Sequence, residues 1–199
     1  METLTLKPAR QFSYEEYSRM VQELAASGQS TGEQAPVYIA ATHMNAKRMK
    51  RLEKHSVINE HLREKMAGLQ QSYSWLVITE SWCGDAAQIV PVIAAVAACS
   101  PKISLSLILR DENPAIMDLF LTNGSRSIPK LICMSGDRIL GTWGPRPKAI
   151  QAMIDAYKRQ HPDAAKEALH EELHLWYARD KTASTHEDLL ACLADWKLT

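Results

Sequence analysis

Residues 75–86 read WLVITESWCGDA, and this stretch constrains the fold of the chain more than any other. Leu76, Val77 and Ile78 form the uninterrupted apolar run that is typical of a strand buried on both faces. The residues that follow, 86–98, are rich in Ala and Val and apolar all round, as in a buried helix. Cys83 therefore stands at a strand-to-helix junction, where the unpaired N–H groups and the dipole of the helix favour a thiolate.

The other cysteines give Cys83 no evident partner. Position 86 is Ala, so no C-x-x-C pair can form. Cys99 would lie about 24 Å along the predicted helix, and Cys133 about 13 Å beyond Pro129 along a predicted strand. Cys192 belongs to a terminal helix whose docking site the sequence does not reveal, and a core thiol is the default for all three. Four scattered cysteines suit reduced thiols in a cytoplasm, and they predict monothiol chemistry at Cys83.

Four landmarks in order resemble the thioredoxin superfamily, over about residues 74–157. Residues 82–86 stand where thioredoxins have W-C-G-P-C, and residues 111–114 resemble the D-x-N-P after the next strand. Residues 127–129 stand where the family has its cis-proline, and residues 136–144 match its N-G…V-G hairpin. The resemblance extends to bacterial cytosolic monothiol proteins with a WCGDA motif, an N-terminal helical extension and a W-G-P-R-P segment. The second cysteine is missing, and the position of the family's buried acid falls on Val77.

The resemblance implies an α/β thioredoxin-like fold, a central mixed sheet flanked by helices, with helical extensions at both ends. It also implies that Cys83 is the catalytic residue and that a cis Ile128–Pro129 bond exposes backbone groups to an extended substrate. The alternative for Pro129 is an ordinary trans proline that enters a strand. The remaining substrate-binding residues that it implies are Trp82, Gly84 and Trp143, although Trp143 could equally be a core residue.

Two charged residues near this site are open to interpretation. Asp85 is expected to modulate Cys83, because a nearby carboxylate favours the protonated thiol. Arg146 could hold the carboxylate of a small thiol, or could be a first-turn helix residue with a structural partner.

The chain is expected to form three zones: a helical extension over 1–73, a thioredoxin-like core over 74–160, and a helical extension packed on it over 161–199. Strands are predicted at 75–80, 103–109 and 130–134, with parallel crossovers between them, and a last antiparallel strand at 138–143. Helices are predicted at 84–98, 114–122 and 146–160, and a short strand at 37–41. An amphipathic pattern over 45–69 suggests one helix, and Ser184 with Glu187 predicts a capping box for the last helix.

Composition excludes several classes of function. Lys plus Arg and Asp plus Glu both number 23, so no bulk charge indicates nucleic acid or an anionic membrane. The basic cluster at 47–51 is interpreted as a solvated helix face rather than a nucleic-acid patch. No apolar run is long enough for a membrane span and no secretory signal is visible, so a cytoplasmic protein is expected.

Residues 170–174 read HEELH, the zinc-protease signature H-E-x-x-H, with Asp180 where some families place a third ligand. Tyr177 stands where the related motif needs Gly, and Leu169, Leu173 and Trp176 form the apolar stripe of an ordinary helix. We therefore interpret both histidines as surface residues and expect no metal and no cofactor.

Two functions follow as hypotheses. The preferred one is a monothiol thiol-disulfide oxidoreductase or redox sensor, with a glutathione-like small thiol or a protein thiol or disulfide as partner. The rival is a non-catalytic module that binds a protein or peptide in the groove beside Pro129. Thiolate character at Cys83 separates them, and the sequence does not fix the oligomeric state.

Overall fold

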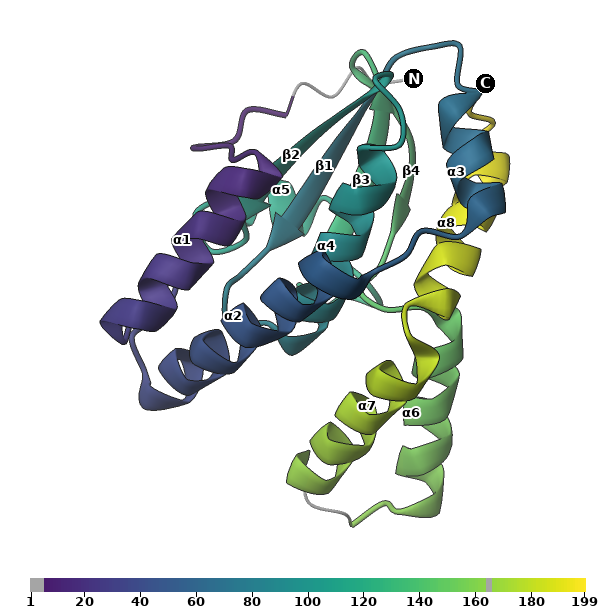
Figure 1. Cartoon of the computed structure of the whole chain (residues 1–199). Helices are drawn as coiled ribbons and strands as arrows, with labels where there is room; N and C mark the ends of the chain where they lie inside the picture. The colour runs from purple at the N-terminus through teal and green to yellow at the C-terminus, as the bar shows by residue number, and fades with distance from the viewer. Residues whose placement is uncertain (1–5, 164–165) are drawn as a thin grey trace.

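The fold is known from a computed structural model that describes residues 6–163 and 166–199. A four-stranded mixed sheet carries eight helices within that part of the chain (Figure 1). In chain order the elements are α1 (Tyr14–Ser27), α2 (Pro36–His55), α3 (Glu60–Ala67), β1 (Tyr73–Thr79), α4 (Gly84–Ala97), β2 (Ile103–Leu109), α5 (Pro114–Asp118), β3 (Lys130–Ser135), β4 (Arg138–Trp143), α6 (Lys148–Gln160), α7 (Lys166–Asp180) and α8 (Ala183–Asp195). The predicted thioredoxin-like α/β fold class is confirmed.

The strand order is β2-β1-β3-β4, and β1 pairs in parallel with β2. The expectation that β3 would also be parallel is wrong, because β3 pairs antiparallel with β1 through Ile78 and Lys130. After β2 the chain does not cross back along the sheet but forms the five-residue helix α5 and a loop. It re-enters the sheet at the end where β1 finishes, so β3 runs antiparallel to β1. The last residues of β1 and the first residues of β3 therefore lie side by side at that end of the sheet.

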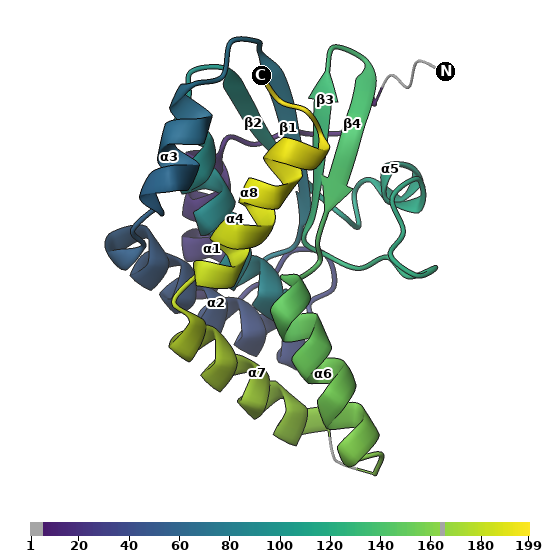
Figure 2. The same ribbon diagram turned by 90° about the vertical axis from the view of Figure 1, so that its right-hand side faces the viewer.

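Helices cover β1 and β2 in successive layers. The side chains of β1 are buried on both faces except at Ser74, as the apolar run predicts. Helix α4 contacts β2 on one side and α2 on the other, and α1 contacts both α2 and β2. Helix α3 lies against α4 and α8. Helices α6 and α7 lie side by side and extend beyond the end of the sheet in both views (Figures 1 and 2).

The N-terminal zone departs from its predicted structure in two places. Residues 37–41 are helical, because Pro36 occupies the first turn of α2 and its N–H-free ring suits that position. Val37 remains 68% exposed, and burial begins at Thr42 on the side that packs against α4. The single helix predicted over 45–69 is interrupted, since α2 ends at His55 and the side chain of Asn59 caps α3 by accepting from Leu62 N at 3.2 Å. A helix start at Pro36 and a cap at Asn59 thus account for the two departures.

The core elements follow the prediction more closely. Strands β1 to β4 and helix α4 match their expected positions within two residues. Helix α5 ends at Asp118, four residues early, and α6 begins at Lys148. The capping box predicted for the last helix is absent: Thr182 is the N-cap of α8, and Ser184 Oγ donates to Asp180 instead.

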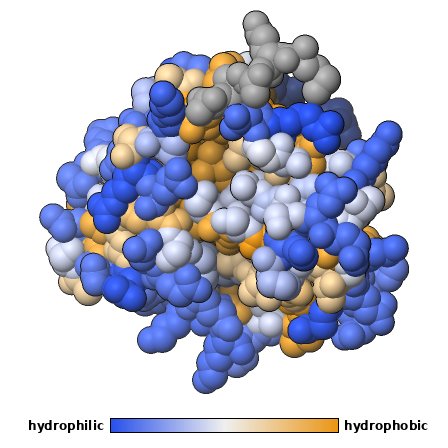
Figure 3. All heavy atoms as spheres, turned by 90° about the horizontal axis from the view of Figure 1, so that it is seen from above, coloured by the Kyte–Doolittle hydropathy of each residue, from blue (hydrophilic) through white to orange (hydrophobic). Residues whose placement is uncertain are grey.

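The end of the molecule near the start of β1 has an ordinary mixed surface. Seen from above, hydrophilic side chains surround smaller hydrophobic areas (Figure 3). No helix in the described part of the chain has the length and hydropathy needed to cross a membrane. The junction between β1 and α4 lies at the opposite end of the sheet.

Candidate functional site

Cys83 is the N-cap residue of α4 and lies beside the loop that leads into β3. Its Sγ accepts a hydrogen bond from Ala86 N at 3.4 Å and donates one to the carbonyl oxygen of Ile128 at 3.3 Å. The Ile128–Pro129 bond is cis, as the resemblance implied. The structure thus brings Cys83 together with Ile128 and Pro129, two of its predicted substrate-binding neighbours.

The thiol of Cys83 is held in its neutral form. The residue is only 8% exposed. Burial, with a smaller contribution from the charge of Asp85, raises the pKa of the thiol to about 12. Backbone N–H groups of Ala86 and Asp85 and the charge of Arg146 oppose this rise without cancelling it. A helix N-terminus therefore does not suffice here to produce a thiolate, because desolvation outweighs the dipole.

Asp85 is clamped between two residues from distant parts of the chain. Arg146 Nε and Nη2 each lie 2.7 Å from Oδ2 of Asp85. The hydroxyl of Tyr177 donates to Oδ1 at 2.8 Å. Asp85 is 6% exposed and Tyr177 7%. The carboxylate thus has an opposite charge and a hydrogen-bond donor, as a buried charge requires.

Helix α7 covers the first turn of α4. His174 Nε2 lies 2.9 Å from Arg48 Nη2, and Arg48 Nη1 donates to Asn45 Oδ1 at 2.9 Å. Asn45 in turn donates to the Ser81 carbonyl at 2.8 Å. A side chain at Gly84 would come within 3.8 Å of both His174 and Arg48. Side chains from α2 and α7 therefore lie over the N-terminus of α4.

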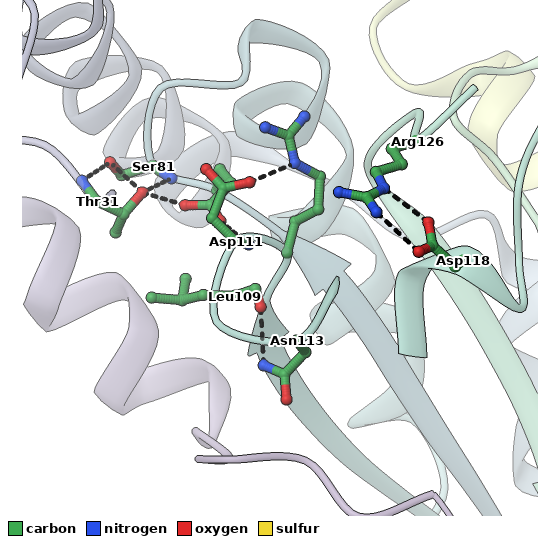
Figure 4. A network of polar contacts seen from close by, with 9 residues as sticks. Thr31, Ser81, Leu109, Asp111, Asn113, Asp118 and Arg126 are labelled. Atoms are coloured by element: carbon green, nitrogen blue, oxygen red, sulfur yellow. Dashed lines mark hydrogen bonds and ion pairs between the residues drawn. The ribbon is translucent and has the colours of Figure 1, made fainter. Parts of the chain in front are cut away.

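A second buried acid, Glu80, lies three residues before Cys83. It is almost fully buried, accepts from the Thr31 hydroxyl and accepts from Asp111 N at 2.9 Å. Burial raises the pKa of its carboxyl. Thr31 also bonds Ser81 through backbone and side chain, so the loop before α2 is tied to the end of β1 (Figure 4).

The two predicted tryptophans lie on different sides of the site. Trp82 packs against the ring of Tyr38, with centroids 5.0 Å apart, and the Arg110 guanidinium lies 4.7 Å above its ring. Trp143 is buried at the end of β4, and its Nε1 donates to Asp188 of α8 at 3.0 Å. Trp143 thus has a structural partner. Its role in substrate binding, like those of Trp82 and Gly84, stays a prediction.

The sequence analysis does not identify two members of this site, Tyr177 and Glu80, and it considers Tyr177 only as an obstacle to a metal motif. Arg146 has a structural partner, Asp85, as one of its two alternatives expects, although it precedes α6. The search for a buried acid considered Val77 but not Glu80, which follows the same buried strand. The one local signal was an acidic residue directly after a fully apolar run, where a charge can be buried only with partners.

The H-E-x-x-H pattern is spread over different environments. His170 is exposed, whereas His174 is half-buried against Arg48, and burial lowers its pKa. The interpretation of His174 as a surface residue is therefore wrong. No group of three metal-ligating side chains occurs among residues 6–163 and 166–199.

Comparisons with known proteins place this geometry in a family. The thioredoxin family model matches residues 32–158, more than half of the chain. A crystal structure of a protein of unknown function from Pseudomonas aeruginosa is similar, at 18% identity and TM-score 0.53, over 92% of this chain and 98% of that one. An HIV epitope scaffold is similar to the same extents, at 20% identity and TM-score 0.52. No curated protein matches the sequence. On its matched fold and sequence, the chain belongs to the thioredoxin family.

Proposed function

We propose that the protein is a monothiol thioredoxin-like redox sensor whose Cys83 is guarded by helix α7. The observation that carries the proposal is the position of Cys83, whose Sγ lies 3.3 Å from Ile128 O at the cis-Pro129 loop. A lone thiol beside the cis-proline loop suits the capture of one half of a disulfide. All four cysteines are free thiols, which supports a reducing compartment such as the cytoplasm.

The reaction takes a disulfide as oxidant, for example glutathione disulfide. The deprotonated sulfur of Cys83 attacks one sulfur of the disulfide, a bond forms between them, and the other half leaves as a thiolate that takes up a proton. The thiolate of a second, external thiol then attacks the captured sulfur; the two leave as a new disulfide, and Cys83 is released as a thiolate that takes up a proton. Position 86 is Ala, so no residue of the motif performs this second step.

The closed arrangement makes this chemistry slow. With a pKa of about 12 the thiolate population is roughly 3,000 times smaller than for a thiol at 8.5. The greater nucleophilicity of the more basic sulfur returns a factor of about 40, so the net reaction is roughly 100 times slower. A guarded thiol that reacts only when α7 moves fits a sensor better than a rapid reductase.

The second candidate is a non-catalytic module that binds a peptide beside Pro129. The same burial and raised pKa of Cys83 favour it, since a binding module needs no thiolate. In that case Cys83 acts through its hydrogen bond to Ile128 O and not through its chemistry.

Treatment with glutathione disulfide separates the two candidates. The native protein and Tyr177→Ala are incubated with glutathione disulfide at pH 8, and peptides are mapped by mass spectrometry. A sensor gains glutathione on Cys83 slowly in the native protein and at least tenfold faster in the variant. If neither protein is modified at Cys83 while Cys99, half-buried just after α4, reacts in both, the binding module is the better description.

A further inference from the structure

A cavity of about 290 Å³ lies behind the site, between the ends of α2 and α7 and the start of α8. Its volume suits a small organic molecule rather than a peptide or a single ion. Tyr177 forms part of its wall, and the hydroxyl of the same residue holds Asp85. Leu52 and Ala178 add apolar surface.

The charge of the wall has one sign. Arg51 and His55 of α2 and Lys181, the residue after α7, line the cavity, and none of its lining residues carries a carboxylate. The nearest acids on these elements are engaged elsewhere. Asp85 is held by Arg146 and Tyr177, and Asp180 accepts from Ser184 N and Oγ. A ligand with a negative group would meet unopposed cations here.

Two hydroxyl groups at the cavity lack partners in the described part of the chain. Ser56 Oγ and Thr182 Oγ1 are buried without a hydrogen bond, and both residues line the cavity. Thr182 is 9% exposed and has a left-handed backbone with φ 72°, which is rare for a β-branched residue. Unpaired buried hydroxyls destabilise a fold, so a ligand oxygen that accepts from them recovers that loss.

We propose that this cavity binds a small amphipathic anion, an aromatic or aliphatic carboxylate or sulfonate. Its apolar body packs on Tyr177 and Leu52, and its charged group meets Arg51, Lys181 and the hydroxyl of Thr182. The cavity exists only while α7 lies against α2 and α4. A ligand that fills it therefore stabilises the closed form and slows the reaction of Cys83, by linkage.

The binding test uses the full chain and a fluorescent aromatic sulfonate, 8-anilinonaphthalene-1-sulfonate. Saturable binding to one site is expected, and N-phenyl-1-naphthylamine, which has the same frame without the sulfonate, should bind at least tenfold more weakly. Arg51→Ala with Lys181→Ala should weaken sulfonate binding at least tenfold. Lys47→Ala, an exposed lysine of α2 outside the cavity, should leave it unchanged.

Two further variants keep the test independent of charge and of folding. Ala178→Trp, at an exposed position of the wall, should fill the cavity and abolish binding with the fold intact by circular dichroism. Thr182→Val keeps the shape and removes the hydroxyl; it should weaken binding while the melting temperature stays the same or rises. Equal binding of the sulfonate and the neutral compound, or binding that survives Ala178→Trp, would overturn the proposal.

The coupling to Cys83 is measured separately and rests on the proposed function. At a sulfonate concentration ten times its dissociation constant, alkylation of Cys83 should slow about tenfold, since only the open form reacts. Unchanged alkylation with intact binding would sink the coupling and leave the site, whereas an unreactive Cys83 with intact binding would sink only the proposed function.

Discussion

The hydroxyl of Tyr177 donates a 2.8 Å hydrogen bond to Oδ1 of Asp85, a residue 92 positions earlier in the chain. This bond joins α7 to the first turn of α4, two residues from Cys83. The carboxylate that adds to the effect of burial on the pKa of the thiol is therefore also the group to which α7 is attached. Reactivity of Cys83 and docking of α7 depend on the same group.

Tyr177→Ala should make Cys83 more accessible. The substitution removes both the buried ring and the bond to Asp85, and each 1.4 kcal/mol lost from α7 docking raises the open population tenfold. We expect alkylation of Cys83 by iodoacetamide to rise at least tenfold. Tyr177→Phe, which loses only the hydrogen bond, should cost about 1 kcal/mol and give a rise of about fivefold. Leu175→Ala, on the exposed side of α7, is the matched control and should alter neither rate.

Asp85→Asn should lower the pKa of Cys83. The buried carboxylate next to the thiol raises that pKa, and its removal also leaves the Arg146 charge free to favour the thiolate. The pH profile of alkylation should shift towards lower pH. Asp118→Asn breaks an exposed ion pair with Arg126 (Figure 4), and neither residue is among the groups that shift the pKa of Cys83, so its profile should match the native one. A profile that does not move in Asp85→Asn would show that burial alone sets the pKa.

Ala86→Cys should convert the site into a dithiol. Ala86 N already points at Cys83 Sγ from 3.4 Å, so the two side chains share the first turn of α4. The variant should form an internal disulfide and gain insulin reduction that the native protein lacks. Ala87→Cys, equally buried but one position further round the helix, is the control and should form no such disulfide. Insulin reduction by the native protein at the same rate would contradict the need for a second thiol.

Gly144→Ala should damage the site from a distance. Gly144 has φ 108°, and an added Cβ would meet the carbonyl oxygen of Pro129 at 2.3 Å, so the backbone must move. We expect a loss of about 2 kcal/mol or more together with slower alkylation of Cys83, because the displaced Arg146 no longer lowers the pKa of the thiol or compensates the charge of Asp85. Gly136→Ala has a positive φ of 57° but no atom within 4 Å. It should cost about 1 kcal/mol and leave alkylation unchanged.

The free energy of unfolding should decrease at alkaline pH, because the buried thiol of Cys83 keeps its proton in the folded state. The folded state holds the proton of Cys83 up to a pKa of about 12, whereas the unfolded chain releases it near 9. Above pH 9 the unfolded state binds fewer protons, so the stability present below pH 9 is lost as pH rises towards 12. Urea unfolding between pH 8 and 10.5 should give a slope for Cys83→Ala that is smaller by up to about 1.4 kcal/mol per pH unit. Equal slopes would mean that burial does not raise the pKa of Cys83 in the folded state.

The predicted features involve residues that are neighbours in the sequence, whereas the missed contacts join residues that are far apart in it. The apolar strand β1, the cysteine after it and the all-round apolar helix α4 are contiguous, so local patterns locate them. The partners of Asp85 lie 61 and 92 residues away, and no local pattern links Arg146 or Tyr177 to it. Residues 37–41, which the sequence analysis predicts as a strand, are instead the first turns of a helix that begins at Pro36 and becomes buried only from Thr42 onwards.

The family match ends at residue 158, whereas Tyr177, which donates to Asp85 beside the thiol, lies beyond it. One partner of the carboxylate next to Cys83 therefore comes from outside the stretch that shows the family, while Arg146 comes from inside it. Relatives with the same core and a different C-terminal helix would share the fold and differ in chemistry. Comparison of cores alone would then group thiols that respond to oxidants at quite different rates.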